Sequence, residues 1–383
     1  MKSRPALTPR QLNRATLDRQ LLLRRRTIDV TDAVRRVLAL QTQEPASPYL
    51  ALWNRISRFD PADLDAAFVN RSVVKASVIR LTLHAVASDD WPAMYDALAP
   101  SLRGSRVFDD RFTSGGVDAA AVDAFLPDLV RALRRPTSGE RVQALIEERF
   151  GAGGRQVWWA MRRFAPLQHA PTGHPWSFGR PAAFVAGQGR LHRPDPAASA
   201  RWLLRRFLQA FGPATAEDFG LFTILRMPVI RPALEALQDA GEIRPVDGPG
   251  RSTLFDLVGG RIPSADVVAP PRLLGMWDNV LLAYADRSRV VPEPFRAVVF
   301  RRNGDVLPTL LVDGEVAGVW RPVDGAIEAT AFRRLDDAVW AGLAKEARGL
   351  LRFLGPREPE VYRRYGHWWG KDMPRHEVRR LPG

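Results

Sequence analysis

The chain has 383 residues, with 56 basic against 42 acidic side chains, a net charge of +14 and no cysteine. This length predicts two or three domains, and the content of 46% hydrophobic and 26% charged residues excludes disordered, collagen-like and low-complexity proteins. The lack of cysteine excludes disulfides, thiolate metal sites and cysteine nucleophiles, and no apolar run reaches the roughly 18 residues of a membrane-spanning helix.

The N-terminal region predicts several helices followed by a pair of strands. Thr8-Pro9-Arg10-Gln11 is a capping box with proline at the first helical position. A second helix begins near Thr31, and Asp60-Pro61 opens another. The β-branched run from 73 to 86 predicts a strand or hairpin. Helices followed by a hairpin are the outline of a winged helix, which we assign to residues 1–92.

The same outline recurs in the middle of the chain. Residues 140–150 and 156–164 have helical patterns, and the stretch 166–185 is rich in proline, glycine, histidine and aromatic residues. Such a composition is typical of a long hairpin or wing. We therefore predict a second winged helix within residues 93–195.

A third unit gives the clearest pattern, between residues 197 and 257. One helix carries apolar residues at helical spacing, Thr215 caps a second, and a third runs from about 231 to 240 and ends at Gly241. Two short strands flank the turn 247–250. These elements predict a helix-turn-helix with a wing, within residues 196–262.

Residues 263–383 have a different pattern. Short strands are predicted at 297–300, 307–312 and 316–320, with an Asp313-Gly314 turn between the last two. A long helix follows, and its predicted buried stripe consists of Leu335, Val339, Leu343, Ala347, Leu350 and Leu354. The predicted fold class is α+β: three tandem winged-helix units and a small C-terminal α+β element.

The charge of the chain points to a polyanionic partner. Arginine supplies 52 of the 56 basic side chains, and GC-rich codons explain that ratio but not the excess of positive charge. A surplus of cations suits nucleic acid, because each neutralised phosphate releases condensed counterions. The alternative is a merely basic, soluble protein. Since the first five residues lack the apolar core of a signal peptide, we expect a cytoplasmic protein without membrane contact.

Several common catalytic signatures are missing from the sequence. There is no Walker A loop, HExxH pair, GxSxG elbow or strand-linked GxGxxG, and no two histidines stand at the i, i+4 spacing of metal ligands. We therefore expect no metal and no cofactor. None of the four lysines has an obviously apolar context that would lower its pKa for Schiff-base chemistry, so lyase activity is not expected.

Gln41 and Gln43 are the most unusual polar residues of the sequence, because they follow the apolar face of a predicted helix. The stripe of Val34, Val37 and Leu38 predicts that position 41 continues the apolar face of a helix, yet it holds glutamine. Pro45 then forces the chain out of helix, so we expect both carboxamides at one helix end. A pair of carboxamides can hold one water in a fixed orientation. Alternatively, both glutamines cap orphan carbonyls at the helix terminus.

This segment resembles the signature of the AlkZ-like DNA glycosylases, whose Gln-x-Gln motif matches Gln41-Thr42-Gln43. A sister branch has aspartate at the second position, so Gln43 places the chain with the glutamine-pair branch. Residues 79–86 are similar to the family strand that ends in Thr-Leu-His, and residues 278–289 resemble its Asp-Asn-Leu-Leu-Leu to Asp-Arg-Ser-Arg segment. The similarity spans roughly residues 5–375.

The resemblance implies a C-shaped array of winged helices around DNA and a function. It implies a monomeric, monofunctional glycosylase that hydrolyses the N-glycosidic bond of bulky N7-alkylguanine in double-stranded DNA. Interstrand crosslinks are possible substrates, and DNA repair or self-resistance to a genotoxin is the implied role. Gln41 and Gln43 would position the water, since a cationic base leaves with little acid catalysis. The competing interpretation is a non-catalytic winged-helix transcriptional regulator.

The DNA contacts predicted from these motifs and from the long hairpin are Arg80, Thr82, His84, His174, Trp176, Asn279, Arg287 and Arg289. For the hairpin, two interpretations stand equal: His174 and Trp176 enter a groove or press on the lesion, or Trp176 and Phe178 pack beneath the loop. The clusters 24–26, 205–206 and 301–302 are candidate phosphate contacts.

Overall fold

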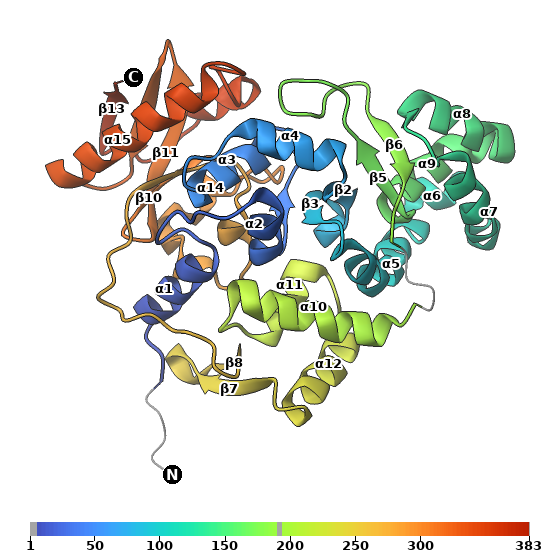
Figure 1. Cartoon of the computed structure of the whole chain (residues 1–383), viewed down its shortest axis with the longest axis horizontal. Coiled ribbons are helices and arrows are strands. Elements are labelled where there is room, and N and C mark those ends of the chain that lie inside the picture. The colour runs from blue at the N-terminus through green and yellow to red at the C-terminus, as the bar shows by residue number, and fades with distance from the viewer. Residues whose placement is uncertain (1–5, 190–193, 383) are drawn as a thin grey trace.

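The structure is a computed structural model that describes residues 6–189 and 194–382 (Figure 1). After helix α1 (Pro9–Arg19), the first winged helix consists of α2 (Val30–Val37), β1 (Leu40–Gln41), α3 (Ser47–Arg55), α4 (Pro61–Val69), β2 (Val73–Ser77), the 3-10 turn η1 (Ile79–Leu81) and β3 (Leu83–Ala87). β3 pairs antiparallel with both β1 and β2. The capping box at Thr8 and the helix start at Asp60 are as predicted.

The second winged helix repeats this order of elements. Helices α5 (Trp91–Val107) and α6 (Asp110–Thr113) lead to α7 (Ala119–Ala132), β4 (Thr137–Ser138), α8 (Gly139–Phe150), η2 (Gly151–Gly153), α9 (Gly154–Phe164), β5 (Leu167–Ala170) and β6 (Ala183–Ala186). β4 pairs with β6, as β1 pairs with β3.

The third winged helix has the same topology with a shorter first strand. It comprises α10 (Pro196–Phe211), α11 (Ala216–Thr223), α12 (Met227–Asp239), β7 (Ile243–Asp247), η3 (Pro249–Arg251) and β8 (Thr253–Leu257). Here the first strand is a single bridge between Ala214 and Phe255. The expected domain boundaries stay a prediction.

The C-terminal element is built on an antiparallel sheet with strand order β13-β12-β11-β10-β9. Its elements are β9 (Arg272–Leu274), α13 (Asn279–Leu282), η4 (Arg287–Arg289), η5 (Glu293–Phe295), α14 (Arg296–Val299), β10 (Thr309–Val312), β11 (Glu315–Val323), β12 (Ala326–Ala331), α15 (Asp337–Leu354), η6 (Arg363–Gly370) and β13 (Glu377–Leu381). In Figure 1 this sheet and α15 lie next to α3 and α4.

Two predictions for the C-terminal element are wrong. Residues 297–300 were expected as a strand, but α14 ends at Val299 and Phe300 makes a single bridge to Val306. β-branched residues favour strands only where a sheet neighbour buries them, and here the prolines of η5 start helical turns instead. Leu335 is buried but precedes α15, because Asp336 caps that helix.

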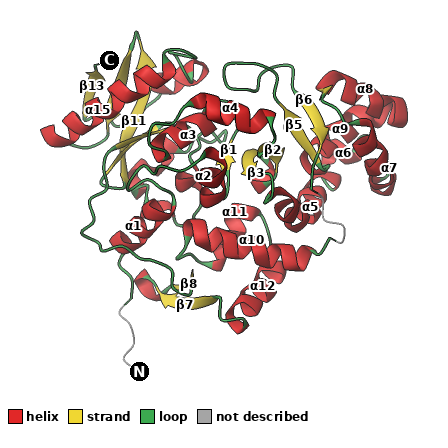
Figure 2. Cartoon of the chain, viewed as in Figure 1, coloured by secondary structure: helices red, strands yellow, loops and turns green. Residues whose placement is uncertain are grey.

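One six-stranded sheet joins the first two winged helices, with strand order β1-β3-β2-β5-β6-β4. β1 is therefore an edge strand, near the middle of the molecule in Figure 2. Adjacent residues of β2 point to opposite faces of the sheet and belong to different hydrophobic clusters. Val73 packs with the first winged helix and the C-terminal element, and Val74 packs with the second and third winged helices. No described helix could span a membrane.

Candidate active site

Gln41 lies in the edge strand β1 and not at the end of a helix, which corrects the expectation from the sequence. Helix α2 ends at Val37, because Leu38 adopts a left-handed conformation with φ of 75°. The apolar stripe thus continues into a strand and not into another helical turn. Gln41 is only 5% exposed.

The two glutamines form a turn. The Gln41 Oε1 atom accepts a hydrogen bond of 2.8 Å from the backbone N–H of Gln43. The Thr42 N–H donates to the Leu83 carbonyl at 2.8 Å and continues the pairing with β3. The Gln41 side chain therefore binds a backbone N–H group. The alternative expectation, in which it binds a free carbonyl at the end of a helix, does not describe this contact. Gln43 itself is exposed, so one carboxamide is buried and the other faces solvent.

His84 is the neighbour of Gln41 on β3. The two residues are directly opposite in the antiparallel register, so their side chains share one face of the sheet. His84 is fully buried, its Nδ1 lies 3.3 Å from the Thr82 carbonyl, and its Nε2 has no hydrogen-bond partner among the described residues. Burial, with Arg80 nearby, lowers the pKa of His84 to about 3, so the imidazole is neutral. Its burial argues against the expected direct DNA contact.

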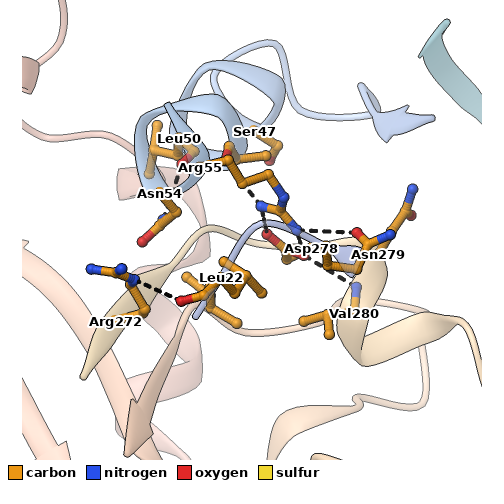
Figure 3. Close-up of polar contacts among 12 residues, drawn as sticks. Leu22, Ser47, Leu50, Asn54, Arg55, Arg272, Asp278, Asn279 and Val280 are labelled. Atoms are coloured by element: carbon orange, nitrogen blue, oxygen red, sulfur yellow. Dashed lines mark hydrogen bonds and ion pairs between the residues drawn. The ribbon is translucent and has the colours of Figure 1, made fainter. Parts of the chain in front are cut away.

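Asn279 covers the open edge of β1. Its Nδ2 donates to the Ala39 carbonyl at 2.6 Å, and its Oδ1 is buried without a partner in the described chain. The side chain is held by the residue before it: Asp278 forms two contacts of 2.7 Å with Arg55 and accepts the N–H of Val280 (Figure 3). This ion pair is almost wholly buried. It therefore fixes the start of α13, and with it Asn279, against the end of α3.

Glu44 follows the motif and is neutralised by residues that sequence reasoning missed. Its carboxylate forms an ion pair with Arg364 and accepts a 3.1 Å hydrogen bond from the Tyr365 hydroxyl. Burial raises the pKa of Glu44, although Arg364 opposes that change. Both partners belong to η6, about 320 residues away along the chain. The dense aromatic and basic composition of 362–369 was the only available signal.

Two arginines of the C-terminal element, Arg287 and Arg301, keep unbonded N–H groups. Nε of Arg287, and Nε and Nη2 of Arg301, are buried without an acceptor in the described chain. Burial, with Arg287 nearby, lowers the pKa of Arg80 to about 10. Each guanidinium lies on an aromatic ring: Arg80 on Phe222 at 5.1 Å, Arg287 on Phe300 at 3.9 Å and Arg301 on Trp368 at 4.9 Å.

Other expected contacts have structural roles. The Thr82 hydroxyl donates to the Ile79 carbonyl at 3.0 Å, which closes the η1 turn. Arg289 donates to the Pro213 carbonyl at 2.9 Å and lies over Tyr284. These bonds leave both side chains less free to contact DNA than Arg80 and Arg287.

The long hairpin turns its aromatic residues inward. Trp176 is 4% exposed, its indole N–H donates to Glu358, and its ring centroid lies 4.9 Å from that of Tyr49. Phe178 is buried too, so the packing alternative describes both residues and the expected DNA contact of Trp176 is corrected. His174 is exposed at the tip and stays a predicted contact.

Lys75 contradicts the expectation that no lysine has an apolar context. It is 5% exposed with its ammonium 4.4 Å from the centre of the Phe178 ring, and burial lowers its pKa to about 8. Lys75 is opposite Ala85 and so occupies the other face of the sheet from His84. It is not part of the surroundings of Gln41. Among the described residues, no three acidic or histidine side chains gather to hold a metal ion.

Comparison with known proteins identifies the family. A model of the family described as "DNA glycosylase AlkZ-like" matches residues 34–353. The chain belongs to the AlkZ-like DNA glycosylase family. It is similar to the "interstrand DNA cross-link repair glycosylase" of Streptomyces sahachiroi, with 27% identity over 367 residues that cover 90% of this chain and 96% of the relative.

The fold agrees with this assignment. The solved structure of Streptomyces sahachiroi DNA glycosylase AlkZ matches with a TM-score of 0.81 and 23% identity, covering 93% of this chain and 99% of the other. The predicted α+β class with tandem winged helices is confirmed. As a member of this family, the protein is a DNA glycosylase, a hydrolase of N-glycosidic bonds, and DNA is its partner. The transcriptional-regulator interpretation is therefore set aside.

Proposed function

We propose that this glycosylase releases bulky N7-alkylguanine from double-stranded DNA, and unhooks interstrand crosslinks formed through that atom, with Gln41 and Gln43 positioning the water. Alkylation at N7 places a positive charge on the base, which makes it a good leaving group. The glycosidic bond then breaks through an oxocarbenium-like state, and a positioned water completes the reaction. The products are the free adducted base and an abasic site in an uncut strand.

The observation that carries this proposal is the neutrality of the polar groups at Gln41. Gln41, Asn279 and the neutral His84 carry no charge, and the nearby carboxylate of Glu44 is paired with Arg364. An uncharged site adds little stabilisation to a cationic sugar. It suits a substrate that supplies its own driving force, as a cationic base does. The crosslink-repair name of the Streptomyces sahachiroi relative supports the same class of lesion.

The arginines that lie on aromatic rings supply the DNA contact in this proposal. Arg80, Arg287 and Arg301 each have a fixed orientation on an aromatic ring, and Arg287 and Arg301 also have N–H groups without an acceptor in the described chain. Such guanidiniums bind phosphate oxygens well, because the planar group matches them and its charge is already partly desolvated. We assign them to the DNA backbone, together with the exposed His174, and we expect a monomer to bind.

The direct test uses one duplex with a single N7-methylguanine, a second with a bulky N7 adduct, a third with an N7 crosslink and an unmodified control. Each is incubated with the protein and then heated in alkali, which cuts the strand at abasic sites. We expect alkali-dependent cleavage at the three lesions only. Cleavage before alkali would reveal lyase activity, and no release from any lesion would overturn the proposal. Sedimentation of the complex checks the stoichiometry.

A further inference from the structure

Two buried polar atoms have no partner in the described chain: Nε2 of His84, which lies opposite Gln41, and Oδ1 of Asn279, which contacts the residue before β1. His84 is 0% exposed and Asn279 is 2% exposed. A buried acceptor without a partner is costly, and proteins usually satisfy such groups with an internal water that makes about three hydrogen bonds. These atoms therefore indicate a hydration site next to the glutamine motif.

The protonation state of His84 defines what it offers to that water. Its Nδ1 faces the Thr82 carbonyl, which can only accept, so Nδ1 carries the proton. Nε2 is left with a lone pair that points into the protein. Arg80 is the charged group that opposes protonation of the ring, and its guanidinium lies on the Phe222 ring of α11. His84 is consequently an acceptor and not a donor.

Gln41 offers the complementary group. Its Oε1 already accepts the Gln43 N–H, so the amide Nε2–H2 is the end left to donate. Gln41 and His84 form a non-hydrogen-bonded pair of the β1–β3 ladder, since Thr42 and not Gln41 bonds to Leu83. In such pairs the two Cα atoms are only about 4.5 Å apart. Asn279 reaches the same strand through the Ala39 carbonyl.

We propose that His84 Nε2 accepts one hydrogen of the attacking water and the Gln43 carboxamide oxygen accepts the other, while the Gln41 amide donates to the water oxygen. This inference rests on the proposed function. Two acceptors and one donor leave a single lone pair on the oxygen for C1′ of the sugar. His84 then touches no DNA directly and becomes a catalytic residue, whereas Asn279 positions the start of β1 through the Ala39 carbonyl.

The reaction balances with these groups alone. As the glycosidic bond breaks, its electron pair leaves with N9 and cancels the charge on the alkylated base. The water lone pair forms the new bond to C1′, and one water proton passes to His84 Nε2. The imidazolium returns that proton to solvent, which restores the neutral ring. No oxidant, metal or further reactant is required.

The test compares three variants in single-turnover release of N7-methylguanine from a duplex. His84→Leu removes the acceptor and should slow release about 100-fold or more, while the affinity for DNA is unchanged. His84→Gln can place its carboxamide oxygen near the position of Nε2 and should retain a rate within about tenfold of the wild type. His169→Gln is the matched control: a half-buried histidine of the same sheet, on β5 opposite Lys75, whose loss should leave the rate unchanged.

Equal rates for His84→Leu and the wild type would overturn this inference, and so would an equal loss in His84→Gln and His84→Leu with both folded. Nitrogen-15 NMR of labelled histidine gives a measurement on the wild type that needs no variant. It should show the His84 Nδ1–H tautomer at pH 7, and an Nε2–H tautomer would contradict the proposal. If the wild type releases no base while His84 has the expected tautomer, the proposed function fails first.

Discussion

The first and third winged helices have the same topology but very different residues where the first strand meets the hairpin. In the third, Ala214 and Phe255 exchange both backbone hydrogen bonds at 2.8 and 3.0 Å, and Ala214 is fully buried among apolar residues. In the first, Gln41 of the first strand lies opposite His84 of the hairpin, and the buried Nε2 atom of His84 has no partner in the described chain. The second winged helix has Thr137 opposite Phe184, which is closer to the third.

This difference separates the fold from the site. A short strand closing on a hairpin is stable with alanine and phenylalanine, so the polar pair of the first winged helix is not needed for the topology. Burying unsatisfied polar groups lowers stability, and such costs are typically retained at functional sites. This difference supports the proposal that the chemistry takes place in the first winged helix.

The largest expected effect comes from making the first winged helix resemble the third at this strand. Gln41→Ala and Gln43→Ala should each slow base release by about 10²–10⁴-fold at nearly constant DNA affinity, with Gln41 the more sensitive because it is buried. The double variant should be little worse than the slower single variant, since both groups act on one water. Single-turnover kinetics and thermal melting on the same proteins measure both quantities.

The variant Gln43→Glu tests whether a carboxylate can replace the carboxamide at this position. The sister branch, with an acid at this position, implies that partial activity survives. If the glutamines were only capping groups, each alanine variant would cost about 1 kcal/mol of stability and leave the rate intact. Full activity in a stably folded double variant would therefore end the catalytic assignment.

Two buried ion pairs provide a second test of the difference between the first and third winged helices. Arg55–Asp278 supports the site, and Arg19–Asp256 joins α1 to the hairpin of the third winged helix, with contacts of 2.6 and 3.0 Å. Asp278→Asn and Asp256→Asn should each lower the free energy of unfolding by about 3–5 kcal/mol, because a buried arginine loses its counter-charge. Urea unfolding measures this loss.

Of these two variants, only Asp278→Asn should slow base release. Asp278→Asn releases the start of α13 and hence Asn279, whereas Asp256 lies on β8, outside the sheet that contains the glutamine motif. Rates are compared at a temperature where both variants stay folded. Equal loss of rate in both would mean that global stability, and not the position of Asn279, controls activity.

Local signals explain what the sequence could predict. Capping residues, turns and β-branched runs lie within one element, so the winged-helix outlines followed from short stretches, and a three-residue motif singled out Gln41 and Gln43 as candidates. The position of Gln41 in a two-residue strand could not be predicted from such a stretch, because that strand exists only through its pairing with Leu83–Ala85. Arg364 on Glu44, and Trp176 against Tyr49, depend on contacts across more than 100 residues. Spacing and propensity carry no information on such contacts.

A smaller effect should separate arginines that bind DNA from those that only add charge. Arg287→Gln and Arg301→Gln should each reduce the slope of log binding constant against log salt by about one, since each removes one phosphate contact. Arg131→Gln is the control, because Arg131 is exposed and paired with Asp128. Fluorescence anisotropy between about 50 and 200 mM salt measures the slopes, and an equal change in all three variants would contradict the assignment.

The smallest expected effect is a pH dependence of stability that the third winged helix cannot share, since its alanine and phenylalanine do not titrate. The pKa of His84 is about 3 in the folded chain and about 6.5 when unfolded, so below pH 6.5 the unfolded state takes up a proton that the folded state refuses. The stabilising contribution is therefore complete above pH 6.5 and is lost as the pH falls toward 3. Between pH 6 and 5 a single such histidine changes the free energy of unfolding by about 1 kcal/mol. His84→Gln removes this proton uptake, so its unfolding free energy should fall less steeply over that interval than that of the wild type. Identical slopes in urea titrations at the two pH values would show that His84 takes up its proton as readily in the fold as in the unfolded chain, which would contradict the lowering of its pKa by burial.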